Sequence, residues 1–157
     1  TYINEQQYSQ AIKQLEVAMR IHKNVPEYNM AMGECCFQLL QYKEAIHHFS
    51  LAVRTRPRNI SGWEALINCL FKAGYYEEAA TQAKAALTAT DNKPVFYYLL
   101  SAALFATAQS KEALAVLETA MEESPKMLKK LLELNPAILQ NHGVVDLIAR
   151  FKKNKRL

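Results

Sequence analysis

The sequence has few residues that interrupt helices and no long hydrophobic segment. Its 157 residues include four glycines and five prolines, while 50% are hydrophobic. This composition is typical of a folded, helix-rich chain and argues against disorder. No apolar run approaches the ~20 residues that a membrane-spanning helix needs. Residues 2–7 (YINEQQ) combine neither a basic region nor a hydrophobic core, so no secretory signal is recognised. We therefore expect a cytoplasmic protein, unless a signal lies outside this sequence.

The sequence also lacks the motifs that mark common active sites. It contains no glycine-rich phosphate loop and no HExxH, GxSxG or CxxC pattern. His47 and His48 fall on a predicted helix, off its packing stripe, and are interpreted as two solvated side chains. A metal site built from them and the cysteines would need side chains from different helix faces to converge. We therefore expect no enzyme, with no catalytic residue, no cofactor and no metal.

Cysteine is scarce and odd in number, with three residues. Cys35 and Cys36 are neighbours and cannot easily pair, and Cys69 lies 34 residues after Cys35. The axes of two packed helices lie ~8–10 Å apart, whereas a disulfide needs Cα atoms within about 7 Å. Cysteines at equivalent positions of neighbouring repeats are therefore too far apart to pair. We expect three reduced, buried thiols, which favours a reducing compartment.

Basic residues are concentrated at the C-terminal end. Residues 1–125 carry 11 Lys and Arg against 13 Asp and Glu, whereas residues 126–157 carry 8 against 2. Such an end could bind nucleic acid or another anionic surface, but aromatic residues are scarce there and a charge run is usually solvated. The residues concerned are Lys126, Lys129, Lys130, Arg150, Lys152, Lys153, Lys155 and Arg156, to which Arg54, Arg56 and Arg58 could add.

A 34-residue period runs through most of the chain. It is carried by two series of alanines and one of tyrosines: Ala11, Ala45, Ala79 and Ala113; Ala18, Ala52, Ala86 and Ala120; Tyr8, Tyr42 and Tyr76. A fixed period of this length marks an array of stacked repeats. Small residues at these positions allow neighbouring helices to approach closely.

The pattern within one period resembles the tetratricopeptide repeat, a helix–turn–helix unit of about 34 residues. The sequence departs from the usual pattern at a few positions: Ile67 and Ser101 stand in place of a small glycine, Asp91 in place of the closing proline, and Ala108 in place of a turn glycine. The residues that carry the resemblance are Met32, Gly33, Cys36, Tyr42, Ala45, Phe49, Ala52 and Pro57; Trp63, Leu66, Gly74, Tyr76, Ala79 and Ala86; Tyr97, Leu100, Ala113, Leu117, Ala120 and Pro125.

The resemblance implies an all-α fold: a right-handed α-solenoid of antiparallel helix pairs, a TPR-like superhelix, with a C-terminal helical cap. The first helix, predicted from about Tyr8 to His22, corresponds to the second half of a repeat. Thr1 to Asn4 would be the last turn of a preceding helix, so we expect that further repeats precede this sequence. After residue 127 the pattern no longer fits the 34-residue unit. The expected units are 1–25, a truncated repeat; 26–59, 60–93 and 94–127, complete repeats; 128–153, capping helices; and 154–157, a basic tail.

The resemblance also implies a concave groove, lined by the first helix of each repeat, in which a partner lies as a peptide or helix. A stripe about 100° from the packing stripe would face it. That stripe carries an aromatic row, Phe37, Phe71 and Phe105, beside acidic Glu34 and Glu64, although these phenylalanines could equally belong to the core. The carboxylate clamp of some family members is not expected, because its basic residues are absent. The expected partner-binding residues are Met30, Glu34, Phe37, Glu64, Asn68, Phe71, Val95, Tyr98 and Phe105.

The sequence thus predicts a non-catalytic protein–protein interaction scaffold. A partner that offers apolar anchors and a basic side chain would suit the groove, and no transmembrane segment is expected. Two alternatives stay open. One is binding of nucleic acid or an anionic surface through the basic end, and the other is self-association as a homo-oligomer through the end of the solenoid.

Overall fold

The computed structural model describes residues 2–155, with side chains described for residues 4–154. Within that range the chain forms helices and turns and contains no strand. It divides into two compact units, an N-terminal unit (Thr1–Ala73) and a C-terminal unit (Gly74–Leu157). The boundary falls inside the stretch 60–93 that the sequence assigns to one repeat.

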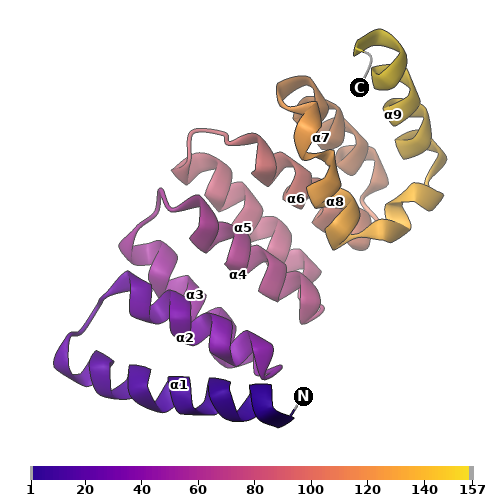
Figure 1. The fold of residues 1–157 in the computed structure, drawn as a ribbon. Helices are drawn as coiled ribbons and strands as arrows, with labels where there is room; N and C mark the ends of the chain where they lie inside the picture. Colours follow the sequence, from indigo (N-terminus) through magenta and orange to yellow (C-terminus); the bar gives the residue numbers. More distant parts are fainter. Residues whose placement is uncertain (1, 156–157) are drawn as a thin grey trace. The chain divides into compact units, whose positions relative to one another are not determined.

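The N-terminal unit is a row of helices: α1 (Tyr2–Ile21), α2 (Pro26–Gln38), α3 (Tyr42–Thr55) and α4 (Ile60–Lys72). Each helix packs against the next, and short turns reverse the chain between them (Figure 1). Helices α2 and α3 both lie within the expected repeat 26–59. The prediction for α1 is wrong at its start, because residues 2–4 belong to the same helix as Tyr8; Thr1 lies outside the described residues.

The helix starts in this unit follow from local chemistry. Pro26 is the first residue of α2. A proline at this position costs no hydrogen bond, because the first N–H of a helix has no partner within the helix. Asn59 precedes α4, and its Oδ1 accepts a hydrogen bond from the backbone N–H of Gly62 at 3.3 Å. The Trp63 indole also donates to the carbonyl of Pro57 at 2.6 Å, which ties the α3–α4 loop to α4.

Three turns at the ends of first helices share one backbone geometry at the 34-residue spacing. Leu40, Gly74 and Ala108 have φ of 61°, 86° and 61°. At Leu40 the N–H of the following Gln41 donates to the carbonyl of Cys36 at 2.8 Å, and at Ala108 the N–H of Gln109 donates to Leu104 at 2.9 Å. These bonds close the helix with a left-handed residue, for which glycine is the usual choice.

The C-terminal unit begins with α5 (Tyr76–Ala89), α6 (Pro94–Ala106) and α7 (Ser110–Glu123). Helix α6 lies between the other two and packs against both. Its residues from Val95 to Leu104 are buried except for Tyr97, which is half-buried. A helix that is apolar on every side is a buried one, so α6 forms the centre of this unit.

The segment predicted as a cap contains η1 (Pro125–Met127), α8 (Leu128–Leu134), η2 (Pro136–Gln140) and α9 (His142–Lys155). Helix α8 packs against α6, and α9 packs against α7 and η2. Two expectations need correction. Leu128 lies 34 residues after Pro94, so α8 starts in the repeat register. The tail expected at 154–157 is helical as far as Lys155, and residues 156 and 157 lie outside the described part.

Among the described residues, no helix combines the length and the apolar character that crossing a membrane requires.

Candidate partner-binding face

The expected groove residues of α2 form one face of that helix. Met30 and Phe37 are half-buried and Glu34 is exposed. The Phe37 ring packs against Tyr42, with ring centroids 5.6 Å apart and planes at 59°. This contact holds the aromatic side chain in place while leaving part of it accessible. We call Met30, Glu34 and Phe37 the α2 face.

The corresponding residues of α4 are Glu64, Asn68 and Phe71, which we call the α4 face. All three are half-buried. They follow the i, i+4, i+7 spacing of one helix side. The structure therefore leaves all six expected residues of the N-terminal unit at least partly accessible.

A pocket of ≈ 290 Å³ connects the α2 face to the start of α4. Its charged residues come from two places, Glu27 and Glu34 from α2 and Arg56 from the α3–α4 loop. Arg56 forms an ion pair with Glu27. The pKa of Glu27 is lowered, first by a hydrogen bond from its own backbone N–H and then by the Arg56 guanidinium. The lining residues are Pro26, Glu27, Met30, Ala31, Glu34, Arg56 and Asn59.

The expected residues of α6 are placed differently. Val95 is 2% exposed and Tyr98 is 0% exposed. The expectation that these two side chains face an accessible groove is therefore wrong. The Tyr98 hydroxyl donates to the carbonyl of Ser124 at 2.8 Å, and burial raises its pKa to about 12. Phe105 is half-buried and lies in the C-terminal unit, so the expected aromatic row is divided between the two units.

A sequence signal for this difference exists. Residues 95–100 read VFYYLL, whereas the corresponding stretch of α2 reads EYNMAM. The helical spacing that predicts the groove residues assigns the same outward face to both helices. However, only the stretch of α2 contains polar residues that favour an exposed face. The pocket beside Arg56 could not have been found this way, because its residues are far apart in the sequence.

The paired histidines do not behave alike. His47 is exposed, as expected, but His48 is half-buried and donates from Nδ1 to Asn29 Oδ1 at 3.1 Å. Burial first, and the neighbouring His47 second, lower the pKa of His48. The expectation that both are solvated is therefore wrong for His48, which helps to join α3 to α2.

The cysteines are free and buried, as predicted. The Cys69 thiol donates to the carbonyl of Tyr42 at 3.8 Å, and burial raises its pKa to about 11. Burial also raises the pKa of Cys35 and of Cys36. These thiols stay protonated at neutral pH and are poor nucleophiles. No cluster of three or more potential metal ligands occurs in the described part of the chain.

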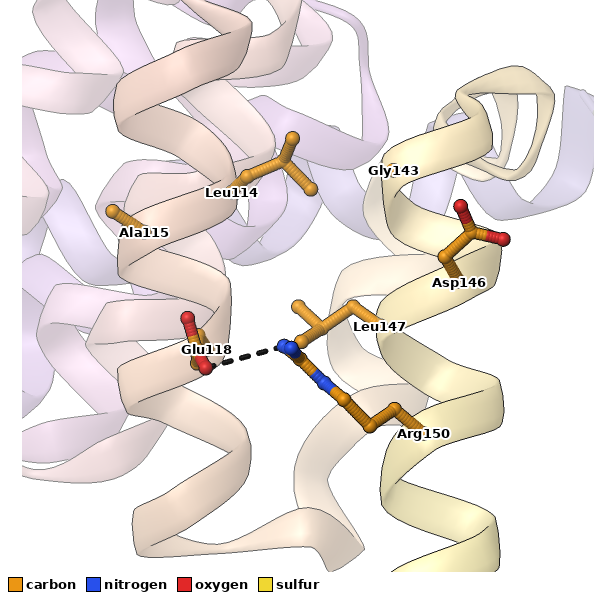
Figure 2. Close-up of a pocket in the computed structure, with 7 residues that line it drawn as sticks. All are labelled: Leu114, Ala115, Glu118, Gly143, Asp146, Leu147 and Arg150. Atoms are coloured by element: carbon orange, nitrogen blue, oxygen red, sulfur yellow. Dashed lines mark hydrogen bonds and ion pairs between the residues drawn. The ribbon is translucent and has the colours of Figure 1, made fainter.

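A second pocket, of ≈ 400 Å³, lies between α7 and α9 (Figure 2). Leu114 and Leu147 point toward each other across it, and Arg150 reaches from α9 to Glu118 on α7. The Arg150 Nη2–Glu118 Oε1 distance is 3.2 Å. Together with the Arg56–Glu27 pair, this shows that two of the residues proposed for anion binding already have acidic partners.

The face proposed for self-association is only partly covered. Ala11, Leu15 and Ala18 of α1 are half-buried, whereas the equivalent Ala45, Phe49 and Ala52 of α3 are buried. Val17 and Ile21 on the same helix are 51% and 69% exposed.

Solved structures that are similar to this chain include MamA and two TPR proteins. MamA residues 41–end from Desulfovibrio magneticus RS-1 is 22% identical, with a TM-score of 0.69 over 95% of this chain and 86% of that chain. YrrB, described as a TPR protein with an unusual peptide-binding site, is 21% identical, with a TM-score of 0.67 over 83% and 67%. TTC0263, a thermophilic TPR protein of Thermus thermophilus, is 20% identical, with a TM-score of 0.62 over 93% and 80%.

A family model assigns the chain more closely. Residues 2–142 match the second ARM domain of tetratricopeptide repeat protein 21. That match covers most of the chain, and it agrees with the helical repeat fold and with the fold of the solved TPR structures. The chain therefore belongs to the family of the tetratricopeptide repeat protein 21 second ARM domain.

Proposed function

We propose that this chain is a non-catalytic interaction module whose partner, a peptide or a helix of another protein, binds across the α2 face and the α4 face. The observation that carries the proposal is the pocket beside Met30 and Glu34, which joins the start of α4 to the α2 face. It offers an apolar floor next to an exposed carboxylate. YrrB, which shares the fold, is a TPR protein described by its peptide-binding site.

The chemistry of the two faces specifies what the partner must supply. Phe37 and Phe71 are half-buried aromatic rings, and aromatic side chains that become fully buried are frequent hot spots of binding energy. Glu34 is an exposed carboxylate at the edge of the pocket. A partner with apolar side chains and one Lys or Arg would bury the rings and neutralise this charge.

A peptide selection tests the proposal. A phage library of random dodecapeptides is selected on the purified chain, and the affinities of enriched peptides are measured by fluorescence polarisation. We expect Phe37→Ala and Phe71→Ala each to weaken binding by about tenfold, the loss of ~1.4 kcal/mol. Val145→Ala, which removes an exposed apolar side chain from α9, serves as the control and should leave binding unchanged.

Thermal unfolding of each variant separates lost binding from lost folding, since Phe37 also contacts Tyr42. If folded Phe37→Ala and Phe71→Ala variants keep full affinity, the two faces are not the binding site. Binding of generic RNA that weakens steeply with salt, in place of peptide binding, would support the anionic-surface alternative.

A further inference from the structure

Helix α8 packs differently from the first helices of the preceding repeats. Helices α2, α4 and α6 each pack against the helix that precedes them, namely α1, α3 and α5. Helix α8 starts in the same register but has α6 as its principal helix partner, while α7 is contacted by α9. The helix that should extend the array thus lies against the first helix of the preceding repeat (Figure 1).

The reason for this change is visible in the sequence. Helices α2, α4 and α6 have 13 residues each, whereas α8 has 7 and ends before Pro136. Proline cannot continue a helix, because its ring clashes with the preceding turn. A helix of two turns is too short to cover α7 along its length, and α9 contacts α7 instead.

The residues of α6 next to this contact occupy the groove positions. Tyr98 and Ala102 are 0% exposed, whereas the equivalent residues of α2, two repeats earlier, are half-buried Met30 and exposed Glu34. Asn135, which follows α8, donates from Nδ2 to the carbonyl of Ala102 at 3.2 Å. Tyr98 is held in turn by the carbonyl of Ser124, just before η1. The chain that follows α7 is therefore hydrogen-bonded to α6 at two of the positions that correspond to the α2 face.

Helix α8 shows the chemistry of a segment that packs against α6. Its sequence is LKKLLEL, in which Leu131 is fully buried and Leu128, Leu132 and Leu134 are half-buried. Lys129 and Glu133 are exposed on the opposite side. The pattern is that of a short amphipathic helix with leucine anchors and flanking charge.

The corresponding surface of the N-terminal unit is open and more acidic. Position 102 is alanine on α6, whereas its equivalent on α2 is Glu34. An occupant there would pack leucine side chains against Met30 and Phe37, and a lysine of the occupant would form an ion pair with Glu34. From these relationships we infer that the α2 face binds a short Leu- and Lys-containing amphipathic helix of a partner protein, of the kind that α8 supplies to α6. This inference rests on the proposed function and specifies the class of partner.

A peptide with the α8 sequence tests the inference. The probe is a fluorescein-labelled synthetic peptide of residues 126–137, KMLKKLLELNPA, titrated with the intact chain and followed by fluorescence polarisation. We expect saturable binding that is weakened about fivefold or more by Glu34→Lys, because the substitution replaces an attractive charge with a repulsive one. Glu122→Lys, the same change at an exposed residue of α7, is the matched control and should leave the affinity unchanged.

The peptide itself provides a second control. Replacing its central leucine by aspartate (Leu131→Asp in the peptide) should abolish binding, since this leucine is the fully buried anchor of α8. Peptide affinity that is the same for wild type and Glu34→Lys would place the probe elsewhere, for example in exchange for α8 itself, and would overturn the inference.

The two proposals can fail separately. If the α8 peptide does not bind but library-selected peptides do, and Phe37→Ala weakens them, the partner class is wrong and the proposed function stands. If neither kind of peptide depends on the α2 face, both are wrong.

Discussion

The ring of Phe49 lies directly against Gly33, where a β-carbon would stand 2.5 Å from Phe49 Cε1. Phe49 is 2% exposed, so its ring has no route to solvent while α2 and α3 stay packed. In the C-terminal unit the equivalent residues are Ser101 and Leu117, both fully buried. In the C-terminal unit the glycine is thus replaced by the larger Ser101, and the phenylalanine by the smaller Leu117. The combined volume of the two side chains therefore stays similar in the two helix pairs.

Substitution of Gly33 tests this size matching. Gly33→Ala should lower the free energy of unfolding by about 1–3 kcal/mol, because the new methyl group overlaps the Phe49 ring. Urea unfolding followed by circular dichroism measures the change. The double variant Gly33→Ser with Phe49→Leu copies the Ser101 and Leu117 pair and should be more stable than Gly33→Ser alone. A double variant less stable than Gly33→Ser would contradict the matching argument.

The left-handed turn residues offer a stabilising change. Ala108→Gly and Leu40→Gly should each raise the free energy of unfolding by up to about 1 kcal/mol, because a β-carbon is disfavoured at φ of 61°. Gly74→Ala, at φ of 86°, should lower it. As a control, Ala106→Gly within α6 should destabilise by about 0.5–1 kcal/mol, because glycine loses more entropy in a helix. The opposite signs at positions 106 and 108 are the decisive comparison.

Removal of the Tyr98 hydroxyl should weaken the link between α6 and the chain after α7. Tyr98→Phe keeps the ring and loses the bond to the Ser124 carbonyl, for an expected cost of about 0.5–1.5 kcal/mol. Thermal denaturation measures this cost, and Tyr97→Phe on the neighbouring, half-buried tyrosine is the control. Equal stabilities of the two variants would show that the Tyr98 hydrogen bond has no net effect.

His48 should make stability depend on pH. Because burial lowers its pKa in the folded state, the neutral ring stabilises the fold fully above the ordinary pKa of histidine, and this contribution is lost as pH falls through the lowered value. Wild type should therefore lose melting temperature between pH ~7.5 and ~5. His48→Gln should lose less, whereas His22→Gln, at an exposed histidine, should behave as wild type. A wild-type slope retained in His48→Gln would assign the effect to other groups.

The contact of α9 with α7 should depend on its apolar side chains more than on its ion pair. Arg150 and Glu118 are 58% and 47% exposed at their side chains, so Arg150→Ala should change stability by less than about 1 kcal/mol. Leu147 is 5% exposed, and Leu147→Ala should cost about 2–4 kcal/mol. Urea unfolding of both variants compares the two losses of stability. A larger loss in Arg150→Ala than in Leu147→Ala would contradict this prediction.

The helices could be predicted closely because their signals are local. The 34-residue period predicts repeats that begin at residues 26, 60 and 94, and helices α2, α4 and α6 begin at these residues. The burial of Cys69 and of the alanines of the complete repeats follows from the same period; these are Ala45, Ala52, Ala79, Ala86, Ala113 and Ala120.

The candidate site was predicted only in part. The periodic stripe places Met30, Glu34 and Phe37 on one helix face, and all three are at least partly accessible. Their role in binding a partner stays a prediction. The same rule fails at Val95 and Tyr98, because it describes a single helix and contains nothing about what packs onto it. It likewise misses the half-buried His48, whose partner Asn29 lies on another helix.

What the sequence alone determined is the repeat: its period, its helices and the small residues at which they meet, since each depends on contacts within one helix pair. Only the tertiary structure decided which repeat faces are open. Pro136 follows the end of α8, and α8 lies against α6. Tyr98 and Ala102 are buried on α6, whereas the equivalent Met30 is half-buried and Glu34 is exposed on α2. The physical reason is that exposure depends on where a later segment packs, which a periodic pattern does not encode.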